Sequence, residues 1–242
     1  MTLEQAKQVM EEARRAFSLK TTNKMFDNLQ LGQPAMVTWV ETINETEKML
    51  AELRFSVGAR EAELKKAVTF NQRTLKSIHS DVRANNPSPN TGSPYTRGKI
   101  MFDRRELGHF TGNCSEQSAV AAYLAITIDW HVATSTYVVT IMPPGDHLFC
   151  VVGLTGDGWP NVAAMKSDGA GPQPIVIDPW MNFVCYASQY PEKAGDKMEK
   201  WLAVGKRIAW WGNDMKTHGW YQPGGDYVAR FLDSKLKYQR AL

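Results

Sequence analysis

The chain has 242 residues, which fits one large domain or one domain with a helical extension. Its net charge is only +3 and no block of Lys and Arg stands out, so the composition argues against nucleic acid as a partner. No apolar run reaches the roughly 18 residues that a membrane span needs, and the N-terminus lacks the apolar region of a signal peptide. We therefore expect a soluble protein, and export by a dedicated secretion system stays open because it leaves no such mark.

The first third of the chain is predicted to be helical and rich in charge. Apolar residues recur at helical spacing from Leu3 to Phe17 and again over residues 35–82. The Asn- and Pro-rich stretch from Asn85 to Pro94 is the clearest loop in the sequence. We therefore predict a helical N-terminal region at residues 1–86 and a catalytic domain at residues 87–242. The N-terminal helices would be an accessory element that binds a secretion chaperone, another partner protein or the substrate.

The second part of the chain begins with a helix and continues with strands. A helix is predicted from Cys114 to about Ile128, because small and apolar residues cover its faces. Apolar and β-branched runs predict three strands, at Tyr137–Ile141, His147–Leu154 and Ile175–Ile177. Two more helices are predicted, at about Ala194–Trp211 and Asp226–Tyr238. A helix followed by several strands indicates an α+β fold rather than alternating β-α-β units.

One cysteine lies where a nucleophile is activated. Gly112 and Asn113 end a loop, and Cys114 begins the predicted helix. Free N–H groups and the positive end of the helix dipole stabilise a thiolate at that position. Gly112 would let the chain bend closely and leave room for a substrate backbone. The alternative is a buried structural cysteine that begins a helix.

A histidine and an aspartate lie at the ends of two predicted strands. His147 opens an apolar strand after a tight turn, which holds an imidazole at the sheet rim, where a general base is needed. Asp178 ends a buried strand, where a carboxylate is costly unless it pairs with a group such as an imidazole N–H. Taken alone, His147 could equally be an ordinary surface histidine, and Asp178 could be an Asp-Pro turn residue that bonds its own backbone. Together with Cys114 they predict a triad of nucleophile, general base and orienting carboxylate.

The other cysteines and histidines fit such a site less well. Cys150 and Cys185 lie in apolar runs and are expected to be buried. No closely spaced cysteine pair indicates zinc, and free thiols suit a reducing compartment. His109, in the loop before Cys114, is the second choice of base. The remaining histidines offer less: His79, His131 and His218.

Three segments carry a family resemblance: Gly-Asn-Cys-Ser-Glu-Gln-Ser, Asp-His-Leu-Phe-Cys-Val-Val and Val-Ile-Asp-Pro-Trp. Together they resemble the papain-like and transglutaminase-like cysteine hydrolases found among bacterial secreted effectors and toxins, over roughly Leu107 to Tyr190. The family's Cys, His and Asp fall on Cys114, His147 and Asp178. The resemblance implies a papain-like α+β fold, in which a central helix carrying the cysteine packs on an antiparallel sheet, with the N-terminal helices as an extension.

The resemblance also implies a chemistry. Such a triad attacks an amide of a protein substrate and forms a thioester, without a cofactor or a metal. Peptide hydrolysis, glutamine deamidation and transamidation share that thioester, and the sequence leaves all three open. The protein would be a thiol protease or deamidase that acts as a virulence effector or toxin in a reducing host cytosol.

Two points stay open in this interpretation. Many relatives of papain carry a glutamine shortly before the cysteine as an oxyanion donor, but residues 106–113 contain none. The backbone N–H of Cys114 is the expected donor instead, and the Asn113 side chain is a weaker one. The alternative function is a non-catalytic helical binding module in which Cys114 is structural.

Overall fold

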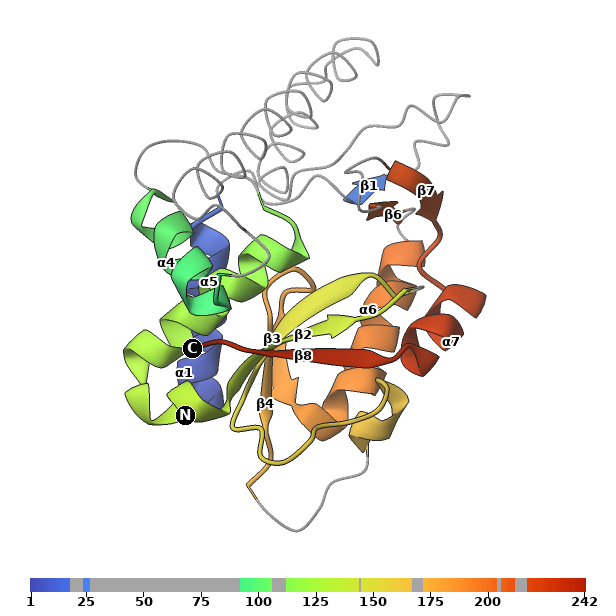
Figure 1. The fold of residues 1–242 in the computed structure, drawn as a ribbon. Helices are drawn as coiled ribbons and strands as arrows, with labels where there is room; N and C mark the ends of the chain where they lie inside the picture. Colours follow the sequence, from blue (N-terminus) through green and yellow to red (C-terminus); the bar gives the residue numbers. More distant parts are fainter. Residues whose placement is uncertain are drawn as a thin grey trace.

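The structure, a computed structural model, describes residues 1–17, 24–26, 92–105, 112–143, 145–166, 172–203, 206–211 and 217–242. Within these residues the chain has an α+β fold (Figure 1). The main sheet has five antiparallel strands in the order β5-β4-β3-β2-β8. Their bounds are β2 Thr136–Ile141, β3 His147–Val152, β4 Ile175–Asp178, β5 Phe183–Tyr186 and β8 Leu236–Arg240.

Helices cover both faces of this sheet. On one side lie α1, α4 and α5, and on the other lie α6 and α7 (Figure 1). Their bounds are α1 Leu3–Arg15, α4 Pro94–Asp103, α5 Cys114–Ile128, α6 Tyr190–Ala203 and α7 Asp226–Asp233. Alternate side chains of a strand point to opposite faces. In β3, Cys150 therefore packs against the α5 side, whereas Phe149 packs against the α6 side.

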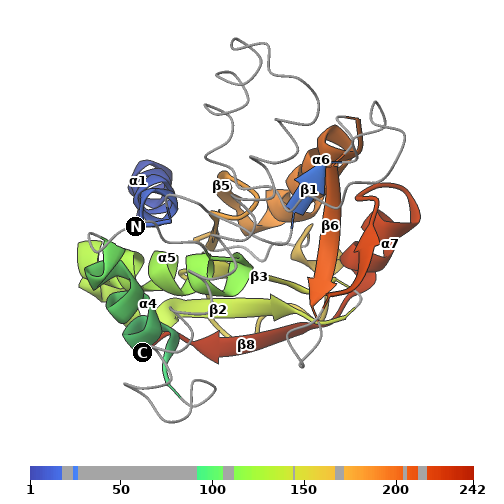
Figure 2. The same ribbon diagram turned by 90° about the horizontal axis from the view of Figure 1, so that it is seen from above.

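A second, smaller sheet has three antiparallel strands in the order β1-β6-β7. These are β1 Lys24–Phe26, β6 Lys206–Trp211 and β7 Thr217–Tyr221. Figure 2 shows β6 beside α6 and α7, away from the group formed by α1, α4 and α5. In the part of the chain that the structure describes, every helix is too short or too polar to cross a bilayer.

Helix α5 forms where the sequence predicts it because it is a core helix. It is apolar almost all round, which is typical of a helix buried on every side. The sheet packs on one side of it, and α1 and α4 cover the rest. The helix therefore needs no polar face, and only its last turn and a few side chains reach solvent.

The first helix departs from the predicted division of the chain. Helix α1 lies within the predicted N-terminal region at residues 1–86, yet Ala6, Val9 and Ala13 are fully buried in the same core as α5. Residues 1–17 therefore pack as part of the same core as α5. Residues 27–91 lie outside the described residues, so the boundary near Pro87 and the helices at 35–82 stay predictions.

Two of the predicted helices are wrong in their second halves. The predicted helix at Ala194–Trp211 is α6, which ends at Ala203, followed by β6. The predicted helix at Asp226–Tyr238 is α7, which ends at Asp233, followed by β8. Short apolar runs fit helix and strand alike, and pairing with strands distant in sequence decides between them. The sequence interpretation also missed α4 and β5.

The packing of α1 gives a test. Val9→Ala should lower the free energy of unfolding by about 1–3 kcal/mol, because it removes two methyl groups from a site with no exposure. Lys7→Ala is the matched control, because Lys7 is exposed on the same helix and should change stability by less than about 0.5 kcal/mol. Urea unfolding measures both values, and a silent Val9→Ala would remove α1 from the core.

Candidate active site

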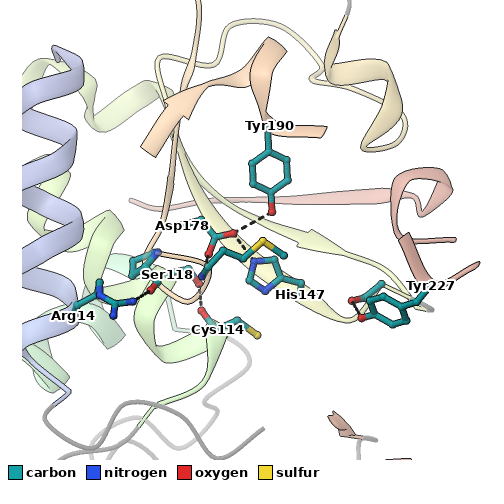
Figure 3. Close-up of polar contacts among 10 residues, drawn as sticks. Arg14, Cys114, Ser118, His147, Asp178, Tyr190 and Tyr227 are labelled. Carbon is teal, nitrogen blue, oxygen red and sulfur yellow. Dashed lines mark hydrogen bonds and ion pairs between the residues drawn. The ribbon is translucent and has the colours of Figure 1, made fainter. Parts of the chain in front are cut away.

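The three predicted site residues lie at the ends of their elements. Cys114 is the first residue of α5, His147 the first of β3 and Asp178 the last of β4. Strands β3 and β4 are antiparallel neighbours, so the start of β3 and the end of β4 lie next to each other at the same end of the strands. All three residues are buried, with exposed fractions of 7%, 2% and 0%. Figure 3 shows them side by side.

The register of the sheet joins the histidine to the aspartate. Cys150 pairs with Ile177, which places Phe149 opposite Asp178 and puts His147 on the same face, one diagonal step away. The His147 Nε2 and the Asp178 Oδ2 are 2.6 Å apart. A carboxylate only accepts hydrogen bonds, so Nε2 carries the proton.

Two further donors hold the Asp178 carboxylate. The Tyr190 hydroxyl donates to Oδ2 at 3.1 Å, and the Met181 N–H donates to Oδ1 at 2.8 Å. Burial raises the pKa of Tyr190, and the nearby Asp178 raises it further, so the phenol stays protonated and donates. The bond from Met181 is the local turn bond that an Asp-Pro turn predicts, so Asp178 makes the turn and binds the histidine at once.

The second nitrogen of His147 is left as an acceptor. In a neutral ring with the proton on Nε2, Nδ1 has a lone pair. Among the described residues this buried atom has no hydrogen-bond partner, the Cys114 thiol included. Figure 3 shows it on the side of the ring that faces the Cys114 sulfur. A buried polar atom without a partner is costly and calls for an explanation. A role as a general base, which needs a nitrogen with an available lone pair, explains why Nδ1 lacks a partner.

The thiol of Cys114 lies beside the beginning of β3. Although most of α5 packs on the other face of the sheet, Cys114 belongs to the apolar cluster on the face of His147. Burial raises the pKa of the thiol, and the Asp146 carboxylate raises it further, while the backbone N–H of Leu148 lowers it. The sequence predicts a thiolate at this helix start. Burial therefore opposes the effect of the helix terminus, and the thiolate stays a prediction.

Aromatic rings surround the histidine. The Trp180 ring centroid lies 4.8 Å from that of His147, with Phe149 at 6.2 Å and Phe231 at 6.4 Å. Trp180 is almost fully buried. These rings lower the local dielectric, which strengthens the bond between His147 and Asp178.

The residues before Cys114 are also fixed by packing. A Cβ atom on Gly112 would lie 2.6 Å from the Phe17 ring, so Phe17 fills the space in the Cβ direction of this glycine. Asn113 is the N-cap of α5, and its backbone N–H donates to the Glu116 carboxylate at 3.0 Å. Its role as an oxyanion donor stays a prediction.

The other histidines and cysteines lie away from the site or outside the described residues. His109 and His79 fall outside the described residues, as does the side chain of His218, and His131 is exposed after α5. Cys150 and Cys185 are buried, as predicted. Among the described residues, no group of three or more His, Cys, Asp or Glu side chains is arranged to hold a metal ion.

Sequence reasoning missed two parts of this site. Tyr190 follows Asp178 by 12 residues, on another element, and no local pattern links the two. Arg14 of α1 donates to the Pro179 carbonyl at 2.7 Å, which ties the corner after Asp178 to the N-terminal helix. Comparison of the chain with protein-family models, curated proteins and solved structures finds no match.

The buried thiols predict a loss of stability at high pH. Burial raises the pKa of Cys150 and raises that of Cys185 to about 12. In the unfolded chain a thiol ionises near its ordinary pKa of about 8.5. Above that pH the unfolded state releases a proton that the folded state keeps, so stability is full below the ordinary pKa and falls as the pH rises.

Cys150→Ala should make this fall shallower by about 1.4 kcal/mol per pH unit, which is the contribution of one proton. Urea unfolding at several pH values between neutrality and strongly alkaline solution measures the slope for wild type and variant. Parallel slopes would mean that Cys150 ionises as easily in the folded protein as in the unfolded chain.

Proposed function

We propose that this chain is a cysteine hydrolase of the papain-like or transglutaminase-like type, which acts on an amide of a protein substrate. One observation carries the proposal. A buried histidine is oriented by a buried carboxylate through Nε2, and its other nitrogen, on the side of a cysteine at a helix start, has no partner in the described part of the chain. A nucleophile, a base and a group that orients the base are the three parts that thiol acyl transfer requires.

The proposed reaction begins from a neutral thiol. The Cys114 sulfur attacks the carbonyl carbon while its proton moves to the His147 Nδ1, and Asp178 stabilises the imidazolium that forms. The imidazolium then gives the proton to the leaving nitrogen, the C–N bond breaks and a thioester remains. His147 next takes a proton from water as the water oxygen attacks the thioester carbonyl carbon. The C–S bond then breaks, the imidazolium returns the proton to the sulfur, and a carboxylic acid leaves with the thiol restored.

The start of α5 supports the charge that develops on the substrate oxygen. The Cys114 backbone N–H lies at the first helical position, where no intrahelical acceptor is available. It is the proposed oxyanion donor, and the Asn113 side chain is the proposed second one.

The type of amide bond that the site accepts is also part of the proposal. We favour hydrolysis in a protein substrate, with glutamine deamidation and transamidation as variants on the same thioester. Action as a secreted bacterial effector or toxin rests on the family resemblance. Binding of a partner protein at the N-terminal helices of residues 1–86 stays a prediction.

One observation favours the non-catalytic alternative. The Cys114 thiol is only 7% exposed and burial raises its pKa, as in a structural cysteine. The pair of His147 and Asp178 argues against this alternative. Apolar residues of similar volume often stabilise a core at least as well as a buried ionisable pair, so stability alone gives little reason for the pair.

Acyl transfer to Cys114 tests the proposal. Wild-type protein incubated with p-nitrophenyl acetate should gain the mass of one acetyl group, located on Cys114 by peptide mapping. Cys114→Ala should keep its fold and lose this acetylation, whereas Cys150→Ala is the control and should keep both. Acetylation that persists at the full rate in Cys114→Ala would contradict the mechanism.

Asp178→Asn tests the orienting role. Asn keeps the acceptor for the Met181 N–H, but its amide group facing Nε2 favours the imidazole tautomer with the proton on Nδ1. That tautomer accepts no proton from the thiol, so acetylation should slow by a factor on the order of 10²–10⁴, since a serine protease loses ~10⁴ in the equivalent change. An acetylation rate equal to that of wild type would mean that Asp178 only forms the Asp-Pro turn and does not orient His147.

A further inference from the structure

Tyr190 contacts three neighbouring strands of the main sheet beside the site. It is the first residue of α6, and its side chain is fully buried. Its ring lies against Phe149 of β3, with the ring centroids 4.5 Å apart, and against Phe183 of β5, at 5.7 Å. Its hydroxyl reaches Asp178 at the end of β4, as Figure 3 shows. The ring is therefore held by the strands on either side of β4 while the hydroxyl meets β4 itself.

The backbone at the start of α6 is fixed as well. The Tyr190 N–H donates to the Ala187 carbonyl. The N–H of Ala187, which is fully buried, donates to the Pro174 carbonyl at 2.8 Å, directly before β4. Pro191 follows the tyrosine, and its ring restricts the backbone in this first turn. The hydroxyl thus has a defined position relative to β4.

Packing explains the ring of Tyr190 but not its hydroxyl. The surrounding cluster is apolar, and a hydroxyl buried there is costly unless it makes a hydrogen bond. A phenylalanine would fill nearly the same space without that cost. The partner of the hydroxyl, at 3.1 Å, is the same Asp178 Oδ2 that accepts the Nε2–H of His147 at 2.6 Å. The acceptor that Tyr190 uses therefore connects it to the histidine.

The Asp178 carboxylate is held at two points from two different elements. The Met181 N–H binds Oδ1 at 2.8 Å, within the turn that Asp178 itself begins. With that bond alone the carboxylate can pivot about Oδ1 and carry Oδ2 away from His147. The Tyr190 hydroxyl fixes Oδ2 from α6. A donor on Oδ2 also stabilises the anionic carboxylate, which keeps Asp178 an acceptor and leaves the shared proton on Nε2.

We infer that Tyr190 is a positioning residue of the proposed site: its hydroxyl fixes the Asp178 Oδ2 as the acceptor of the Nε2–H and so keeps the His147 Nδ1 available for the Cys114 proton. This inference rests on the proposed function. Tyr190 acts on the histidine through the carboxylate and not on the substrate. The orientation of the base then depends on α6 as well as on β3 and β4.

Tyr190→Phe removes the hydroxyl and keeps the ring. NMR of protein with isotope-labelled histidine nitrogens distinguishes the two imidazole tautomers, and His147→Gln identifies the His147 signals by their loss. Wild type should show the Nε2–H tautomer of His147 alone, and Tyr190→Phe should also populate the Nδ1–H tautomer, because Oδ2 is no longer fixed. Acetylation of Cys114 by p-nitrophenyl acetate should slow by a factor on the order of 10–10², since a small misplacement of a catalytic group costs up to about 10²-fold.

Tyr238→Phe is the matched control. The Tyr238 hydroxyl also makes hydrogen bonds, accepting from the Trp159 N–H at 2.7 Å and donating to the Trp159 carbonyl at 2.8 Å. It lies on β8, however, which is separated from β3 by β2. Its loss should lower the melting temperature and leave the His147 tautomer and the acetylation rate as in wild type.

The outcomes separate this inference from the proposed function. An unchanged tautomer in folded Tyr190→Phe overturns the inference, whatever the rate, and loss of acetylation in Cys114→Ala would still support the hydrolase. A changed tautomer in a protein whose wild type is not acetylated supports the action of Tyr190 on His147 and removes the hydrolase.

If Tyr190→Phe does not fold, wild type alone decides. The Tyr190 hydroxyl proton and the His147 Nε2 proton point at one oxygen, so a nuclear Overhauser effect should connect them. Observation of both protons without that effect overturns the inference.

Discussion

The hydrogen bond between the His147 Nε2 and the Asp178 Oδ2 is the interaction on which the proposed site depends. It joins the start of β3 to the end of β4 at 2.6 Å, with both side chains buried. Burying two ionisable groups is costly unless the remaining lone pairs find donors, and here Tyr190 and Met181 supply them. Because the carboxylate is satisfied on both oxygens, the histidine is held in one orientation and one tautomer. Its free nitrogen is thereby kept for another group.

The rest of the fold places the cysteine and braces this pair. Helix α5 is long and buried, so its first residue has a defined position at the sheet edge. Two residues of the N-terminal segment contact the surroundings of the site. Phe17 packs beside Gly112, just before Cys114, and Arg14 donates to the Pro179 carbonyl, just after Asp178. The N-terminal segment at residues 1–17 is thus part of the framework of the site.

The sequence pattern of a single segment was sufficient to predict the helices and strands whose own residues determine their conformation. Uniform apolarity predicts α5 with its observed bounds, and β-branched runs predict β2, β3 and β4 to within two residues. The same elements predict that Cys114, His147 and Asp178 lie at element ends. What failed depends on contacts between separate elements: β6 pairs with β1 and β7, and Tyr190 reaches Asp178 from α6.

The central claim is that the His147 Nδ1 takes the proton of Cys114. The most direct measurement is the rate at which iodoacetamide alkylates Cys114 at neutral pH in wild type and in His147→Gln. In the variant the amide group of Gln can still donate to Asp178, but the base is removed. The account predicts alkylation of Cys114 at least roughly tenfold slower in folded His147→Gln than in wild type, because only the thiolate is nucleophilic. Equal rates in the two proteins would contradict it.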